Sequence, residues 1–386
     1  MKKITIKQRR LDVLTGIKHR KQGIREVVSS SKACWINRID YRPVNDFIDR
    51  EIKNGLRHQK LKNRKNGIII HLPEVMDFDK NYDVTVQHLN AIIELVTLFR
   101  RNKGRLLPRG AYHLASVNFD HLKSISTPAA LCLTAEISNW EDSIRNKLKP
   151  QIKCWNDDIY GQLHDLGFFD LFENKPQKPP CKVGKVSDKR LVRYIKGLCG
   201  DEGKTKQLKD GISAIVGDKI QKWTFLHSGL DEAITNVSHH AYPETEFQRS
   251  MMKNWFLTGS YSERTKELKV AFYDQGVGIP KKLPTSKVKE KVFEYLSSFE
   301  AGERRKDEVL LKAAVEVGRT RTGRADRGKG LHDLLEFIKK RESGRLSILS
   351  GRGHYKFTLE NGEERSTTSR SKLPIQGTLL IWSVIL

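Results

Sequence analysis

The stretch LKVAFYDQGVGIPKK, from Leu268 to Lys282, decides the fold. It begins as an apolar strand that ends on Asp274, and the chain then passes at once into Gly276 and Gly278. Glycines there let the backbone turn tightly and approach a ligand, and a carboxylate at a strand end can accept hydrogen bonds from an amino group. An ordinary β-turn after a strand would look similar, so the stretch needs support from elsewhere in the chain.

A helix that precedes this strand carries a stripe of polar residues. Within LDEAITNVSHHAYPE, from Leu230 to Glu244, Glu232, Asn236 and His240 lie four residues apart and share one side of the helix. Asparagine is a poor helix former in mid-helix, so Asn236 either has a role or is simply solvated. His239 and His240 are adjacent and point about 100° apart, so we expect no transition-metal site there. The other side is an apolar face for packing on a sheet, formed by Leu226, Leu230, Ala233, Val237 and Ala241.

A third glycine-bearing segment is GRTRTGRADRGKGLHDLLEFI, residues 318–338. It places glycines and five cations directly before a helix, and the N–H groups at a helix N-terminus attract phosphate. It is not a Walker loop, and its Gly-x-Gly is too short for a dinucleotide fingerprint. Taken alone, a basic surface loop explains it equally well.

The order and spacing of these segments resemble those of the GHKL, or Bergerat-fold, ATPases, and DEAITNVSHHAY resembles the anti-sigma-factor kinase branch. Glu232 with Asn236 is similar to the N box of that superfamily, and Asp274–Pro280 is similar to its first glycine box. The second glycine box resembles Arg327–Leu331, although Asp326 stands where a glycine is often found, and Gly377-Thr378 resembles the closing element. The resemblance covers residues 206–386.

The resemblance implies a role for each of these residues. Asn236 would bind Mg²⁺ through its amide oxygen, and Glu232 would orient or deprotonate the attacking water. Asp274 would bind the adenine amino group, Thr378 would contact the adenine side, and His240 would cap or line the pocket. The other implied ATP-binding residues are Gly276, Gly278, Ile279, Arg327, Gly328, Lys329, Gly330 and Leu331.

The expected fold is α/β, with a smaller α/β domain before a two-layer sandwich of Bergerat type. The sandwich would have a mixed, mainly antiparallel sheet with helices on one face. Strands are predicted in NGIIIHLPEVMDF, AYHLASVNF and PAALCLTAEI, and helices over 85–101 and from about 139 to 172. The predicted parts are a basic arm over 1–65, an α/β domain over 66–172, a Pro- and Lys-rich linker over 173–205, and the ATP-binding domain over 206–386.

Charge and composition limit the partners. The net charge is +25, and residues 1–65 hold nineteen Lys and Arg against six Asp and Glu. Such an arm suits nucleic acid or an acidic protein surface, or it is a solvated tail. The five cysteines form no CxxC pair, the first residues lack the apolar core of a signal peptide, and no apolar stretch could span a membrane. We therefore expect a cytoplasmic protein with no membrane partner.

The function expected from the resemblance is Mg²⁺-dependent ATP binding, in a nucleotide-controlled switch or slow ATPase. A protein partner would be recognised by the N-terminal domain, and a homodimer is left open. A serine protein kinase of the anti-sigma-factor type is an alternative, as is an ATP-dependent protein that binds nucleic acid through residues 1–65. A sensor histidine kinase is disfavoured, because residues 66–205 lack a two-helix dimerisation segment.

Overall fold

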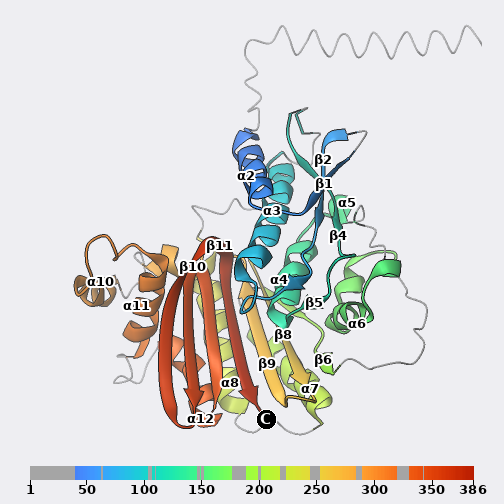
Figure 1. The fold of residues 1–386 in the computed structure, drawn as a ribbon. Coiled ribbons are helices and arrows are strands. Elements are labelled where there is room, and N and C mark those ends of the chain that lie inside the picture. The colour runs from blue at the N-terminus through green and yellow to red at the C-terminus, as the bar shows by residue number, and fades with distance from the viewer. Residues whose placement is uncertain are drawn as a thin grey trace, which may run out of the picture. The chain divides into compact units, whose positions relative to one another are not determined.

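A computed structural model gives the arrangement of the helices and strands. The structure describes residues 40–61, 64–102, 107–108, 110–145, 148, 152–175, 188–198, 201–217, 223–243, 253–283, 289–319, 330–341 and 343–386. The architecture is mixed α/β, with a mainly antiparallel sheet and helices packed against it (Figure 1). The expected α/β class, with a mainly antiparallel sheet, is therefore confirmed.

The largest sheet has the strand order β10-β11-β9-β8-β6, and β7 also pairs with β8. Every pairing among its described strands is antiparallel. Its strands are β6 (Lys189–Leu191), β7 (Ile195–Leu198), β8 (Asn254–Ser262), β9 (Glu267–Asp274), β10 (Gly344–Glu360) and β11 (Glu363–Ile385).

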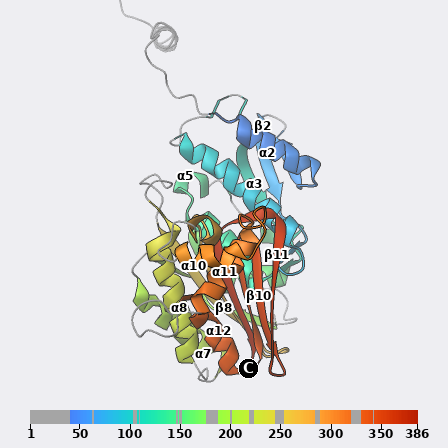
Figure 2. The ribbon, with the colours of Figure 1, turned by 90° about the vertical axis from the view of Figure 1, so that its left-hand side faces the viewer.

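Helices from the C-terminal half cover one face of this sheet. They are α7 (Thr205–Val216), α8 (Trp223–Asn236), α11 (Asp307–Arg319) and α12 (Gly330–Arg341), and Figure 2 shows α8 and α12 beside the strands. Leu226, Leu230 and Ile234 of α8 share one buried core with Leu257 and Phe272 of the sheet. The predicted apolar face of this helix therefore packs on the sheet as expected.

Helix α4 (Thr127–Ser138) covers the opposite face. Phe256 and Tyr273 point away from the Leu257 side, yet they are also buried, because alternate residues of a strand face opposite sides. The hydroxyl groups of Thr127 and Ser260 lie 2.7 Å apart across this contact. The sheet thus has helices of its own on one face and a helix from the N-terminal half on the other.

The prediction of a strand in PAALCLTAEI was wrong, because this segment forms most of α4. All residues from Thr127 to Ile137 are buried, so the helix has no polar face and shows no helical period in its sequence. Pro128 stands in the first turn, where a proline needs no N–H donor.

The predicted linker over 173–205 is shorter than expected. Residues 189–198 contain β6 and β7, both of which pair with β8. The indole nitrogen of Trp255 donates to the carbonyl oxygen of Leu198 at 3.0 Å, so the core fixes this segment. The segment was misread because strands of three and four residues leave little periodicity.

The basic arm predicted over 1–65 also contains folded residues. Helix α2 (Arg42–Lys53) buries Val44 and Ile48, and strand β1 (His58–Leu61) pairs with β2 (Arg64–His71). Strand β2 in turn pairs in parallel with β4 (His113–Asn118). The rest of this half comprises β3 (Val75–Met76), α3 (Tyr82–Arg101), β5 (Ser124–Ile125), α5 (Asp142–Arg145), η1 (Ile152–Cys154), α6 (Asp157–Leu166) and η2 (Phe168–Leu171).

The helix predicted from about 139 to 172 is not continuous, because the structure divides it into α5, η1, α6 and η2. Other predicted elements are confirmed with adjusted limits. The helix predicted over 85–101 is α3, and LKVAFYD is β9. The segments RLSILSG and YKFTLE lie in one continuous strand, β10. Strand β8 and helix α11 were not predicted. Among the described residues, no helix is long and apolar enough to cross a membrane.

A substitution at Gly197 tests whether β7 belongs to the sheet. A Cβ atom on this residue would lie 2.0 Å from the Trp255 ring, so Gly197→Ala should lower the free energy of unfolding by about 1–3 kcal/mol in urea melts. Gly203→Ala is the matched control, since a Cβ there meets nothing within 4 Å. Equal stability of the two variants would contradict this placement of β7.

Candidate functional site

The candidate site is built around the last residue of β9. Asp274 is 4% exposed, and its Oδ1 accepts a hydrogen bond from the Gly276 N–H at 2.8 Å. Thr378 of β11 lies opposite it in register and bonds to the same carboxylate. Burial raises the pKa of Asp274 to about 7, although the bonds from Gly276 and Thr378 oppose that shift. The fold thus keeps a carboxylate where its charged form is unfavourable.

Ser350 of β10 ties Gly377 to the turn Asp274–Pro280, which resembles the first glycine box (the glycine box below), and sequence reasoning missed it. Its hydroxyl group accepts from the Ile279 N–H at 2.9 Å and donates to the Gly377 carbonyl oxygen at 3.0 Å. The Thr378 hydroxyl lies 3.1 Å away. No signal in RLSILSG marks this serine, because its role arises from the pairing of Ser350 with Thr378 across two strands.

Three glycines are required by close contacts within the protein. Gly278 has φ +84°, and a Cβ there would lie 2.8 Å from the Ser350 hydroxyl oxygen. Gly377 has φ +72°, and its Cβ would lie 1.9 Å from the Asp274 carbonyl oxygen. A Cβ on Gly276 would lie 2.4 Å from the Ala241 carbonyl oxygen. The predicted reason for these glycines, a tight turn and close approach to a ligand, is thus joined by packing that the sequence does not reveal.

Helix α8, which carries the segment that resembles the N box (the N-box helix below), reaches the same edge of the sheet. After α8 the chain forms a π-helical turn, Val237–Ala241, and the Ala241 carbonyl accepts from the Val277 N–H at 2.8 Å. Tyr242 reinforces the junction, because its hydroxyl oxygen lies 3.1 Å from the Gln275 N–H. The end of the helix is therefore locked to the glycine box, as a shared site requires.

Glu232 and Asn236 form a pair on this helix. The Asn236 amide nitrogen donates to Glu232 Oε1 at 2.9 Å, which leaves the amide oxygen as the atom that can meet a cation. His240 lies in the π-helical turn, whose wider winding shifts it off the line through Glu232 and Asn236. His239 is exposed, and no group of three His, Cys, Asp or Glu within the described residues could hold a metal ion.

The segment that resembles the second glycine box, Arg327–Leu331, lies only partly within the described residues. Gly330 begins α12, as predicted, while Arg327, Gly328 and Lys329 lie outside the described residues, as does the side chain of Leu331. Helix α12 ends at Arg341, and β10 begins at Gly344, at the far end of that strand from Ser350. The N–H groups at a helix N-terminus can meet an anion.

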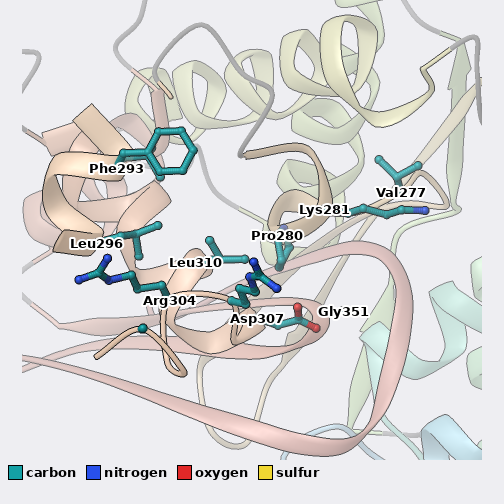
Figure 3. A pocket seen from close by; sticks show the side chains of 12 residues that line it. Val277, Pro280, Lys281, Phe293, Leu296, Arg304, Asp307, Leu310 and Gly351 are labelled. Carbon is teal, nitrogen blue, oxygen red and sulfur yellow. The ribbon is translucent and has the colours of Figure 1, made fainter. Parts of the chain in front are cut away.

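A cavity of about 900 Å³ adjoins the glycine box (Figure 3). Val277, Pro280 and Lys281 line one side of it, and Phe293 and Leu296 of α10 (Lys289–Ser297) line the other. Arg304 and Arg305 add positive charge to its wall. Neither Asp274 nor Thr378 is among its described lining residues, so the cavity lies beside this pair.

Asp307 of α11 and Gly351 of β10 also line this cavity. The Asp307 carboxylate accepts from the Arg352 N–H at 2.7 Å. Gly351 has φ +58°, and a Cβ there would lie 2.7 Å from the same carboxylate. Sequence reasoning missed both residues.

The structure thus brings Asp274, Gly276, Gly278, Ile279 and Thr378 together, with Glu232 and Asn236 on the helix locked to them. A scan against protein-family models finds no match for the chain, and a search of curated proteins finds none either. The resemblance to GHKL ATPases therefore remains a prediction that rests on the motifs.

The raised pKa of Asp274 predicts a pH-dependent stability. Its folded-state pKa, about 7, lies above its ordinary value of 3.8, so the wild type loses stability as the pH rises between these values. Asp274→Asn removes this loss. It should raise the free energy of unfolding by up to about 4 kcal/mol at pH 8 and by almost nothing at pH 4, measured by urea melts at each pH.

Asp201→Asn is the control for that measurement. Bonds from the Leu198 N–H and from Lys204 lower the pKa of Asp201, so this variant should gain no stability at pH 8. A stability difference between Asp274→Asn and wild type that stays constant from pH 4 to pH 8 would contradict the burial argument.

Proposed function

We propose that this chain binds ATP with Mg²⁺ at the Asp274 edge of the sheet and acts as a nucleotide-controlled switch or slow ATPase. The observation that carries the proposal is the buried carboxylate of Asp274, held beside Thr378 where the glycine box meets the N-box helix. A buried carboxylate with a raised pKa, next to a cavity and a glycine turn, is typical of a functional site.

The base would be recognised at Asp274. Its carboxylate has one oxygen bound by the Gly276 N–H, and its charged form would accept a hydrogen bond from the adenine amino group. Thr378 would support that contact through its hydroxyl group, which Ser350 holds in place. Guanine has a carbonyl group in place of this amino group, so its carbonyl oxygen would face the carboxylate oxygen, and both are acceptors. The site therefore favours adenine over guanine.

The phosphates would lie toward the N-termini of helices and the cations of the second glycine box. The N-terminus of α12 begins at Gly330, and Arg327 and Lys329 directly precede it in the sequence. Asn236 would contribute its amide oxygen to Mg²⁺, which prefers oxygen ligands and retains several waters. The bound ion would neutralise phosphate charge.

Glu232 is the candidate general base. Its carboxylate is held by the Asn236 amide nitrogen, which fixes the side chain one helical turn from the proposed metal ligand. A carboxylate so placed can orient a water or take its proton. The same helix ends against the glycine box at Ala241, so the groups assigned to base and to metal are carried on connected elements.

Binding is tested by isothermal titration with ATP and Mg²⁺ at pH 8. Asp274→Asn should weaken binding by at least about tenfold, because it replaces the charged acceptor of the adenine amino group by a weaker, neutral one. The loss cannot be ascribed to unfolding, since this variant is expected to be more stable than wild type. Asp201→Asn should bind like wild type, and equal affinities of wild type and Asp274→Asn would overturn the site assignment.

Hydrolysis is tested by phosphate release from Mg-ATP. Glu232→Gln should keep ATP binding while its turnover falls by about 100-fold or more, as expected for loss of a general base. Asp231→Asn is the matched control, because the neighbouring carboxylate pairs with His227 at 2.8 Å and should be dispensable for turnover. Unchanged phosphate release in Glu232→Gln would remove this residue from the catalytic role.

A further inference from the structure

Gln275 links the glycine box to the N-terminal half of the chain. It follows Asp274 directly and is only 6% exposed. Its amide nitrogen donates to Glu136 Oε2 at 2.7 Å, and its amide oxygen accepts a hydrogen bond from the Asn139 side chain. Glu136 lies in the last turns of α4, and Asn139 is the C-cap of that helix. Both the nitrogen and the oxygen of the Gln275 amide are therefore hydrogen-bonded to α4 or to its C-cap residue.

The residues around this bridge are buried or half-buried, and they are hydrogen-bonded to one another. Trp140 donates from its indole nitrogen to Glu136 Oε1 at 3.0 Å, so both oxygens of that carboxylate accept bonds. The Asn139 amide oxygen accepts from Lys196 at 2.8 Å and from Asn254 at 2.9 Å.

The network closes on Gln275 itself. The Asn254 carbonyl accepts from the Tyr242 hydroxyl at 2.6 Å, and that hydroxyl oxygen lies 3.1 Å from the Gln275 N–H. The ring of bonds thus runs from the glycine box through α4 and β8 to the end of the N-box helix and back.

Such a ring makes the position of α4 and the shape of the glycine box interdependent. If α4 moved relative to the sheet, buried amide and carboxylate groups would lose their partners, which is costly. Burial already raises the pKa of Glu136, so its carboxylate depends on these donors. A movement of the glycine box would break the same bonds from the other side.

We propose that Gln275 is a positioning residue that couples nucleotide binding at Asp274 to the packing of α4 on the sheet. This inference rests on the proposed ATP site. The coupling is reciprocal: bound nucleotide stabilises the α4 contact, and an intact α4 contact holds the glycine box ready for nucleotide. The N-terminal half would then report the nucleotide state to whatever contacts that half.

The test is hydrogen exchange of the α4 amides in the full chain, with and without saturating Mg-ATP, together with titration calorimetry. In wild type, Mg-ATP should slow exchange in α4 by about tenfold. Gln275→Met keeps the length of the side chain but loses both hydrogen bonds. It should bind ATP about tenfold more weakly, and at saturation it should show almost no change in α4 exchange.

Ser260→Ala is the matched control. It removes the contact to Thr127 from the same helix–sheet interface but touches no residue of the glycine box. It should keep the wild-type affinity and the wild-type response of α4 to ATP. Glu136→Gln approaches the bridge from the α4 side and should reproduce a weaker form of the Gln275→Met result.

The outcomes separate the two proposals. Calorimetry that detects ATP binding, with no change in α4 exchange in wild type, would overturn the coupling and leave the proposed function intact. A Gln275→Met protein that responds to ATP like Ser260→Ala would also overturn it. Absence of ATP binding to wild type would overturn the proposed function, and the coupling with it.

Discussion

The candidate site depends on one buried carboxylate and on the groups that hold it in place. Asp274 ends β9 with its oxygen on the Gly276 N–H and with Thr378 opposite, and burial raises its pKa to about 7. An ionised aspartate in such a place destabilises the fold, since desolvation outweighs the bonds that it receives. A side chain retained at this cost is more readily explained by a ligand than by packing, and this is the physical basis of the proposed ATP site.

The surroundings of Asp274 consist of contacts that tolerate little change. Gly276 and Gly377 leave no room for a Cβ, and Ser350 links β10 to the glycine box. The N-box helix ends against the same turn through Ala241. On the other side, Gln275 donates a hydrogen bond to Glu136 of α4, so the position of that helix also depends on the glycine box. The site is therefore connected by short contacts to both halves of the chain, which a switch between two nucleotide states would need.

The sequence predicted the elements that carry a clear period or a clear motif. Strand β9 with its terminal Asp274 and the apolar face of α8 could be predicted, because alternation and helical spacing are local properties. Helix α4 could not, since a helix that is buried all round loses the polar face that reveals it. Ser350 acquires its role from strand register, because it pairs with Thr378 of the neighbouring strand. Gln275 acquires its role from a contact with Glu136, which lies more than a hundred residues away in the sequence. Local spacing encodes neither relation.

The most direct test of the Asp274 assignment is the ratio of the GTP and ATP dissociation constants of the wild type, measured from pH 5.5 to pH 8.5. The ratio cancels the titration of the phosphates, which both nucleotides share. Above pH 7 the ionised carboxylate should prefer ATP, and as the pH falls below about 7 this preference should shrink toward one, because a protonated Asp274 can donate to the guanine carbonyl. A ratio that stays constant across the range, or no preference at pH 8.5, would contradict the account.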